Sequence, residues 1–185
     1  MNTIELLDQG YAWTAARIAA VSADGLDDPT PCSLWSLHEL LDHTIGTLTM
    51  FADAPANAGA KPDARDVRAL SETPWDRAIA ELAARSRQAW KAPGVMDRTF
   101  ELPFGTMPAR VAVSANLLEA VVHGWDISQA SGEAADIPDA LALPILEFAR
   151  DALVDPNRGD KFAADLGIGG TPSDQLVAFL GRKPL

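Results

Sequence analysis

Residues 108–131 read PARVAVSANLLEAVVHGWDISQAS, and this stretch decides the fold. Its apolar side chains recur every three or four residues, the spacing that places them along one side of an α-helix. The apolar line consists of Val113, Leu117, Val121 and Trp125, with Leu118 and Val122 beside it. A helix this long and this apolar packs against other helices, so we expect it to be the most buried element of the molecule.

A stripe of polar residues interrupts this apolar helix at spacings of three, four and three. The stripe consists of Asn116, Glu119, His123 and Asp126. A carboxylate does not leave water without a compensating partner, so the stripe requires water, a hydrogen-bond network or a cation. Glu119 and His123 lie one helical turn apart and offer two metal ligands on the same face. The alternative is that this pair is an exposed neighbour contact or a small hydrogen-bonded cluster.

A further candidate ligand, His43, lies on a helix predicted over residues 36–54. Ser36 and Glu39 have the S-x-x-E spacing of a capping box at the start of this helix. His43 borders its apolar face, whereas His38 falls on the far side and is expected in solvent. If the two helices pack together, His43 meets the polar stripe and completes a set of one oxygen and two nitrogen ligands. Three protein ligands with an open fourth position are typical of a catalytic zinc site. The alternative is that His43 is an ordinary residue at the boundary of the core.

The remaining periodic segments predict further helices and no sheet. Helices are expected over residues 2–22, 36–54, 73–90, 108–131, 138–153 and 171–180, with Thr73 as N-cap and Pro74 at the first helical position of the third. Residues 95–107 alternate only briefly before Pro103 and Gly105, and are interpreted as an extended excursion or tight loop too short for a sheet. The sequence therefore predicts an all-α protein: a four-helix bundle with one or two short additional helices, in a single domain over residues 1–185.

The charge balance excludes two classes of partner. Lys and Arg number 15 against 26 Asp and Glu, a formal net charge of −11, which repels nucleic acid and anionic membrane surfaces. The N-terminus has no basic stretch followed by an apolar run, and no apolar segment is long enough to span a bilayer. Cys32 is the one cysteine, which excludes an internal disulfide and a zinc site built on thiolate pairs. We therefore expect a folded, cytoplasmic protein with no nucleic-acid or membrane partner.

Several residues allow two interpretations from sequence alone. Asp126 either accepts a hydrogen bond from a metal-bound histidine or is a solvated carboxylate at the helix end. Asn116 either bonds a substrate or ligand, or makes a polar contact between helices. Cys32 lies either near the metal or simply buried, and the structural interpretation is favoured, since no His or Lys neighbours it in sequence. The five tryptophans are assigned to packing and not to catalysis.

Two segments of the chain are similar to those of a known family. Residues 30–43 read TPCSLWSLHELLDH, and residues 118–126 read LEAVVHGWD. Together with Pro103–Gly105 and the closing residues 176–182, they resemble the DinB-like superfamily. The similarity is to the branch that contains the metal-binding domain of mycothiol-dependent maleylpyruvate isomerase, and it extends along most of the chain.

The resemblance implies a four-helix bundle that binds a divalent metal, usually zinc, through His43, Glu119 and His123. A carboxylate in the ligand set fits this branch, because the typical DinB triad is three histidines. The resemblance also implies a low-molecular-weight thiol such as mycothiol as co-substrate. The isomerase has a further domain after its bundle, whereas this sequence ends at Leu185, so isomerase activity itself is not carried over.

These features lead to two functional hypotheses. The first is a metal-dependent transferase or isomerase that uses a thiol or water, activated by the metal, on a small electrophilic substrate. The second is a non-catalytic binding or dimerisation module whose polar stripe is a degenerate metal site. Zinc is the expected ion, and nickel, manganese and iron remain open because imidazole and carboxylate accommodate all of them. A homodimer also remains open, since helix bundles of this size often pair through an exposed apolar face.

Overall fold

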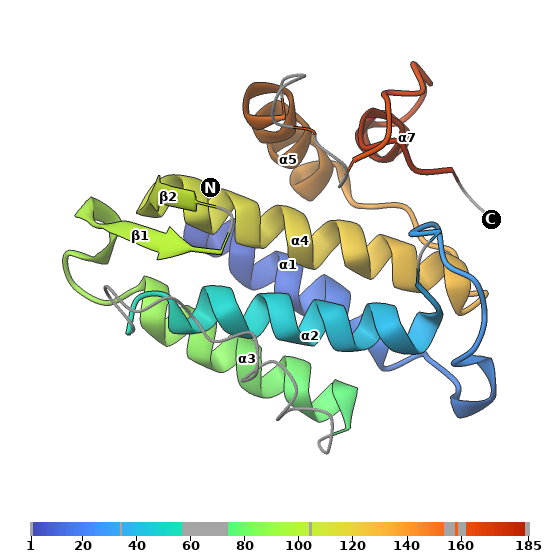
Figure 1. The fold of residues 1–185 in the computed structure, drawn as a ribbon, viewed down its shortest axis with the longest axis horizontal. Helices are drawn as coiled ribbons and strands as arrows, with labels where there is room; N and C mark the ends of the chain where they lie inside the picture. The colour runs from blue at the N-terminus through green and yellow to red at the C-terminus, as the bar shows by residue number, and fades with distance from the viewer. Residues whose placement is uncertain are drawn as a thin grey trace.

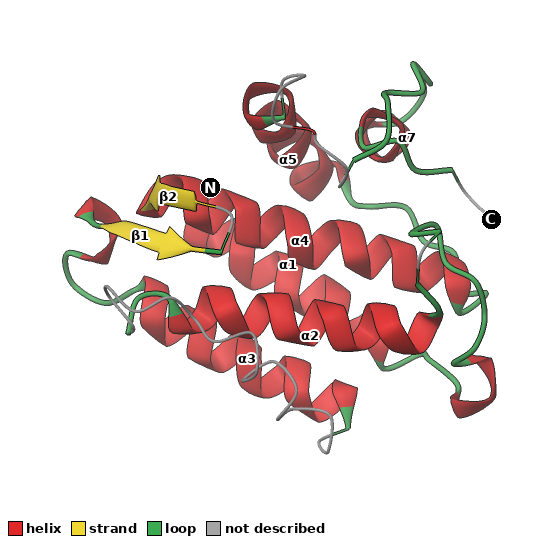
Figure 2. Ribbon diagram, viewed as in Figure 1, coloured by secondary structure: helices red, strands yellow, loops and turns green. Residues whose placement is uncertain are grey.

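The computed structural model describes residues 2–33, 35–56, 74–103, 105–153, 158 and 162–183. Within these residues the chain forms six α-helices, two 3-10 turns and one β-hairpin (Figures 1 and 2). The elements are α1 (Thr3–Ile18), η1 (Ala23–Gly25), α2 (Leu37–Asp53), α3 (Trp75–Trp90), η3 (Val95–Asp97), β1 (Thr99–Leu102), β2 (Gly105–Pro108), α4 (Ala109–Ala130), α5 (Asp139–Ala152) and α7 (Pro172–Phe179). The predicted all-α class, a four-helix bundle with short additional helices, is confirmed.

Helices α1 to α4 form the bundle, with α4 in contact with both α1 and α2 (Figure 1). Of the 22 residues of α4, 16 are buried, which agrees with the prediction that this helix lies deepest in the molecule. The predicted capping box of Ser36 with Glu39 begins α2, and a second capping box, Asn2 with Glu5, begins α1. Each box satisfies backbone N–H groups that have no partner inside the helix, so the sequence fixes where these helices start.

Helices α1 and α4 approach each other closely at Gly124. A Cβ atom added there would lie 2.8 Å from the Thr14 hydroxyl oxygen and 2.8 Å from the Trp13 ring. Beside this position, the Thr14 hydroxyl donates a 2.7 Å hydrogen bond to the backbone carbonyl of Ala120. The absence of a side chain at Gly124 therefore sets the spacing of the two helices immediately next to His123.

The hairpin corrects the prediction that residues 95–107 are too short for a sheet. Strands β1 and β2 pair antiparallel, with Phe100 opposite Met107 and Leu102 opposite Gly105. Phe100 and Leu102 are both buried, and the Phe100 ring packs edge-on against Trp90 at a centroid distance of 5.4 Å. These contacts with the bundle stabilise a pair of strands that local sequence pattern could not support alone.

Two predicted helix boundaries also differ from the structure. Helix α3 begins at Trp75 with Pro74 as its N-cap, one residue later than predicted, and the proposed cap Thr73 lies outside the described residues. Helix α1 ends at Ile18 and not near residue 22, because Ser22 caps the following 3-10 turn by accepting a hydrogen bond from the Asp24 N–H. At the end of α1, the local hydrogen bond to the Ser22 cap outweighs the continuing apolar period.

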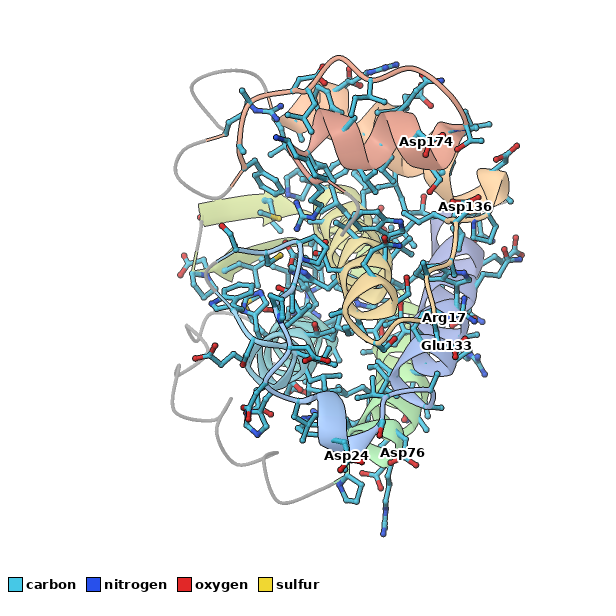
Figure 3. All side chains as sticks on the ribbon, turned by 90° about the vertical axis from the view of Figure 1, so that its right-hand side faces the viewer. Arg17, Asp24, Asp76, Glu133, Asp136 and Asp174 are labelled. Carbon is cyan, nitrogen blue, oxygen red and sulfur yellow. The ribbon has the colours of Figure 1, made fainter. Side chains whose placement is uncertain are left out.

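Helices α5 and α7 pack against each other, and α5 also contacts α4 and α1 (Figure 1). The labelled side chains of Asp24, Asp76, Glu133 and Asp136 are exposed at the periphery of the molecule (Figure 3). In the described part of the chain, none of the helices combines the length and hydrophobicity needed to cross a bilayer.

Gly124→Ala is expected to destabilise the fold by about 1 to 3 kcal/mol, because the added methyl group meets α1 at less than van der Waals distance. The matched control is Gly169→Ala, where no atom lies within 4 Å of the added methyl group, so its stability should stay unchanged or rise slightly. Urea unfolding of both variants measures the difference. Equal stability of the two variants would contradict the close approach of α1 and α4.

Candidate metal centre

The loop before α2 is folded tightly onto the start of that helix. The Thr30 hydroxyl lies 3.0 Å from the carbonyl oxygen of Cys32 and 2.9 Å from that of Trp35. The backbone N–H groups of Leu37 and His38 donate to carbonyl groups of the same loop, at Asp28 and Leu26. These bonds hold the Cys32 and Trp35 side chains beside the helix that carries His43.

Three side chains predicted as ligands come together between α2 and α4. One ligand atom from each of His43, Glu119 and His123 lies within 4.8 Å of the others. The His123 Nε2 is 3.2 Å from a Glu119 carboxylate oxygen, and the imidazole rings of His43 and His123 are nearly perpendicular with centroids 5.1 Å apart. His38 lies on the solvent side of α2 with half of its side chain exposed, as predicted.

This donor set fits a divalent metal ion of the zinc type. Two donor atoms bound to one tetrahedral ion at about 2.1 Å lie roughly 3.4 Å apart, close to the observed separation of His123 and Glu119. The remaining ligand-atom separations lie within 4.8 Å and would contract on binding. Two neutral imidazoles and one carboxylate would leave a net charge of about +1 on a bound divalent ion and a position for an exogenous ligand.

The ligand groups influence one another's pKa values. Burial by itself would raise the pKa of Glu119, but the hydrogen bond and charge of His123 outweigh it and hold the pKa below its usual value. Burial by itself would lower the pKa of His123, but hydrogen bonds to Asp126, Cys32 and Glu119 raise it well above its usual value. A bound metal ion would compete with a proton for His123, because a metal ligand must be deprotonated.

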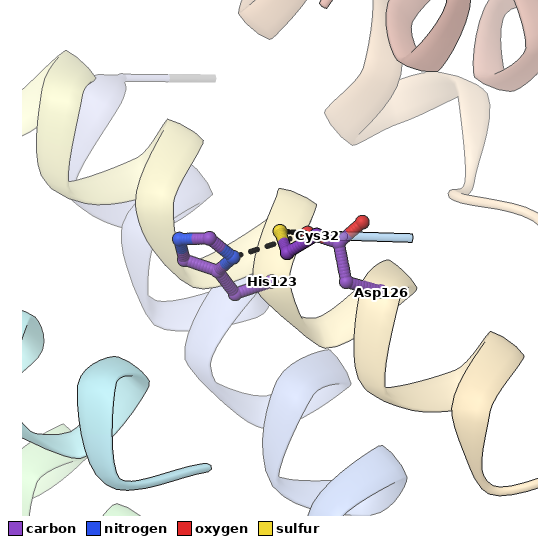
Figure 4. Close-up of side chains that lie close together, drawn as sticks. All are labelled: Cys32, His123 and Asp126. Atoms are coloured by element: carbon purple, nitrogen blue, oxygen red, sulfur yellow. Dashed lines mark hydrogen bonds and ion pairs between the residues drawn. The ribbon is translucent and has the colours of Figure 1, made fainter. Parts of the chain in front are cut away.

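A second cluster contacts the other nitrogen of the same imidazole (Figure 4). The Asp126 carboxylate lies 3.1 Å from His123 Nδ1 and accepts a 3.2 Å hydrogen bond from the Cys32 thiol. Cys32, His123 and Asp126 also offer three ligand atoms within 4.8 Å of one another. The described residues therefore include two groups of candidate metal ligands that share His123.

An arginine distinguishes the two groups. The buried Arg182 side chain donates from Nε to both oxygens of Asp126, at 3.0 and 3.1 Å, and its Nη2 lies 3.6 Å from Cys32 Sγ. Burial opposes ionisation of Asp126, yet the charge of Arg182 and the His123 hydrogen bond keep its pKa below the usual value. A guanidinium group thus supplies the positive charge that a metal ion would bring to this second cluster, so the group with His43 and Glu119 is the better metal site.

Asp126 and Asn116 have different surroundings. Asp126 contacts His123, which is the arrangement expected of a carboxylate that orients a metal-bound histidine. Asn116 is fully buried and accepts a 3.2 Å hydrogen bond from the Tyr11 hydroxyl, a contact between α4 and α1. The contact with Tyr11 matches the interhelical alternative for Asn116.

Sequence reasoning did not assign three residues to this region. Trp35 packs against the core as predicted, and its ring also lies 4.1 Å from the His43 ring, centroid to centroid, and 6.1 Å from that of His123. Cys32 also packs against the core, and its thiol donates to Asp126. Arg182 lies in the closing segment that carries the family resemblance, but no local pattern gave it a role. For Trp35 and Cys32 the available signal was their position within 11 residues of His43 in one tightly closed loop.

Comparison with known proteins gives a family match over much of the chain. The family described as the mycothiol maleylpyruvate isomerase N-terminal domain matches residues 7–128. Two uncharacterized proteins of Mycobacterium tuberculosis, from strains CDC 1551 / Oshkosh and ATCC 25618 / H37Rv, are each 35% identical over 176 residues. The matched region covers 91% of this chain and 91% of each relative.

Solved structures show the same fold. The crystal structure of the mycothiol-dependent maleylpyruvate isomerase matches with a TM-score of 0.60 at 17% sequence identity, covering 77% of this chain and 65% of the isomerase. A histidine-to-alanine mutant of that enzyme matches with a TM-score of 0.59 at 16% identity and the same coverage. The chain thus spans about two thirds of the solved isomerase, and the predicted resemblance is confirmed for family and fold.

Tyr11 provides a test of the buried contact between α1 and α4. It is the one tyrosine in the chain, and burial raises its pKa from 10.0 to about 12. Because the folded pKa lies above the unfolded one, the stability contributed by the neutral phenol is complete below pH 10 and is lost progressively between pH 10 and 12. Ultraviolet tyrosinate absorbance should therefore rise only well above pH 10 in the folded protein, and near pH 10 in denaturant. A folded-state midpoint near 10 would contradict the burial of Tyr11.

Proposed function

We propose, from the premise that this chain belongs to the family of mycothiol maleylpyruvate isomerase N-terminal domains, that it is a divalent-metal enzyme acting on a small electrophile with a thiol co-substrate. The observation that carries the proposal is the convergence of His43, Glu119 and His123 within 4.8 Å. The solved relative is named as an isomerase that depends on mycothiol, which supports a low-molecular-weight thiol as the second reactant.

The chain's own residues would each have a distinct part in this reaction. His43 and Glu119 hold the ion from two different helices, which fixes its position relative to the bundle. His123 contributes Nε2 while its Nδ1 stays bonded to Asp126, so its ring cannot rotate freely. Zinc, or nickel in its place, when bound, lowers the pKa of a thiol or water so that a nucleophile exists near neutral pH.

Trp35 would shape the approach to this centre. Its ring stacks on His43 and lies near His123, so it covers one side of the ligand set with an apolar surface. Trp35 is half-buried, so it is not sealed inside the core. An apolar wall of this kind excludes water and favours a thiol or an electrophile with a carbon skeleton.

A second candidate function is a non-catalytic module with a degenerate site. The observation in its favour is that both nitrogens of His123 already have carboxylate neighbours, Glu119 on Nε2 and Asp126 on Nδ1. Such a network satisfies the buried polar groups with protons alone. The two functions differ in whether the purified protein carries metal. A role in dimerisation would give a dimer of this chain in solution.

Metal content tests the ligand set directly. Protein purified without chelator is expected to carry nearly one divalent ion per chain, and His43→Ala or His123→Ala should lose it. His38→Ala is the matched control, since His38 lies on the same helix as His43 with half of its side chain in solvent. Elemental analysis gives the stoichiometry. If the parent protein neither retains nor takes up zinc, nickel, manganese or iron, the degenerate module is the correct function.

Turnover of an electrophile in the presence of a thiol tests the catalytic part of the proposal. With mycothiol or another physiological thiol present, the zinc-loaded protein should convert at least one member of a panel of small electrophiles, among them cis-unsaturated dicarbonyl compounds, either to a thiol adduct, which consumes the thiol, or to an isomer, which regenerates it. The rate should fall by at least about a hundredfold in His123→Ala, because losing the ion removes the activation of the nucleophile. His38→Ala should retain the parent rate. Inactivity of the metal-loaded parent with every thiol and electrophile pair would contradict the proposed chemistry.

A further inference from the structure

The C-terminal residues after α7 return to the metal centre. Gly181 follows the helix with a φ of +76°, and the Arg182 N–H donates a 2.9 Å hydrogen bond to the carbonyl of Val177. This turn closes the end of α7 in the manner of a Schellman motif, and a Cβ atom at Gly181 would lie 2.5 Å from Ala163. The turn therefore directs the Arg182 side chain away from α7 and toward α4.

Arg182 is held in one orientation by the groups around it. Its Nε contacts both Asp126 oxygens, its Nη1 lies 3.4 Å from the carbonyl of Leu180, and its Nη2 lies 3.6 Å from Cys32 Sγ. Only 9% of its side chain is exposed, and the Asp126 side chain is fully buried. A buried ion pair of this geometry is fixed, because either partner alone would be an uncompensated charge away from water.

We infer that Arg182 is a positioning residue for the metal centre, acting on His123 through Asp126. Arg182 orients the Asp126 carboxylate, and Asp126 in turn accepts from His123 Nδ1, which leaves Nε2 directed at the Glu119 side of the ring. The charges of Arg182 and Asp126 cancel, so this support adds no net charge to the ligand set. The inference rests on the proposed metal function, and it concerns a residue outside the family match of residues 7–128.

The same arrangement disfavours metal binding by the second group of candidate ligands, Cys32, His123 and Asp126. A cation between Cys32, His123 and Asp126 would lie beside a guanidinium that already contacts two of these three residues. Like charges at such a distance repel strongly in a buried site. Arg182 therefore directs metal to one side of His123 by occupying the other.

Zinc affinity of the intact chain tests this role. Arg182→Gln is expected to raise the zinc dissociation constant about tenfold, at the lower end of the range for residues that support metal ligands. Arg110→Gln is the matched control, because Arg110 is exposed on the first turn of α4, about 13 Å along the helix from Glu119. Competition with a chromophoric chelator measures both constants. An Arg182→Gln protein that binds zinc within twofold of the parent overturns the inference.

Two further measurements separate positioning from general stabilisation. If Arg182 acts through Asp126, the double variant Asp126→Asn/Arg182→Gln should bind zinc no more weakly than Asp126→Asn alone, whereas additive losses overturn the inference. The absorption spectrum of bound Co²⁺ should change in Arg182→Gln and stay unchanged in Arg110→Gln. This spectrum reports the geometry of the metal ligands and not the stability of the fold. An unchanged spectrum in both variants overturns the inference.

A second variant covers the case in which Arg182→Gln does not fold. Arg182→Lys then replaces it, because lysine keeps the charge but not the planar fork of donors. A severalfold rise in its zinc dissociation constant supports the inference, and parent-like binding overturns it. A parent protein that binds no divalent metal overturns the proposed function together with this inference, whereas a metal-binding parent insensitive to Arg182 overturns this inference alone.

Discussion

The structure depends on one constraint: the polar stripe of α4 lies inside a bundle, where each polar group needs a partner. Asp126 and Asn116 are fully buried, and His123 is nearly so. These side chains have almost no contact with solvent water. An unpaired buried charge would therefore cost several kcal/mol. The partners come from α1, from the loop before α2 and from the C-terminal segment, so this stripe ties together segments far apart in sequence.

His123 is the point at which two different solutions to this constraint meet. On Nδ1 it joins a network of fixed charges, in which Asp126 is compensated by Arg182. On Nε2 it faces Glu119, which among the described residues is compensated by the two imidazoles and by the more distant Arg182. The Glu119 side therefore has negative charge to offer a cation, whereas the Asp126 side has already been neutralised. This asymmetry selects one ligand group of the two that geometry alone would allow.

Local signals were sufficient to predict the bundle and most of the candidate site. Helical spacing placed Glu119, His123 and Asp126 on one face, and the capping box at Ser36 fixed the phase of α2 and so the position of His43. The hairpin could not be predicted in this way, because β1 and β2 are stabilised by Trp90 and the rest of the bundle. Cys32 and Arg182 contact Asp126 across 94 and 56 residues of chain, and no periodicity reports a contact between such distant segments.

The position of Arg182 also bears on what counts as the functional unit of this chain. The family match ends at residue 128, just after the polar stripe, and it contains all three proposed ligands. Arg182, the residue that compensates Asp126, nevertheless lies beyond residue 128 in the sequence, after both α5 and α7. A bundle limited to the matched residues would leave a buried carboxylate beside His123 with no cation except a proton or a metal ion. Asp126 would then compete with Glu119 for that cation. The segment that follows the bundle therefore does more than cover its surface, because it determines which side of His123 remains available to a ligand.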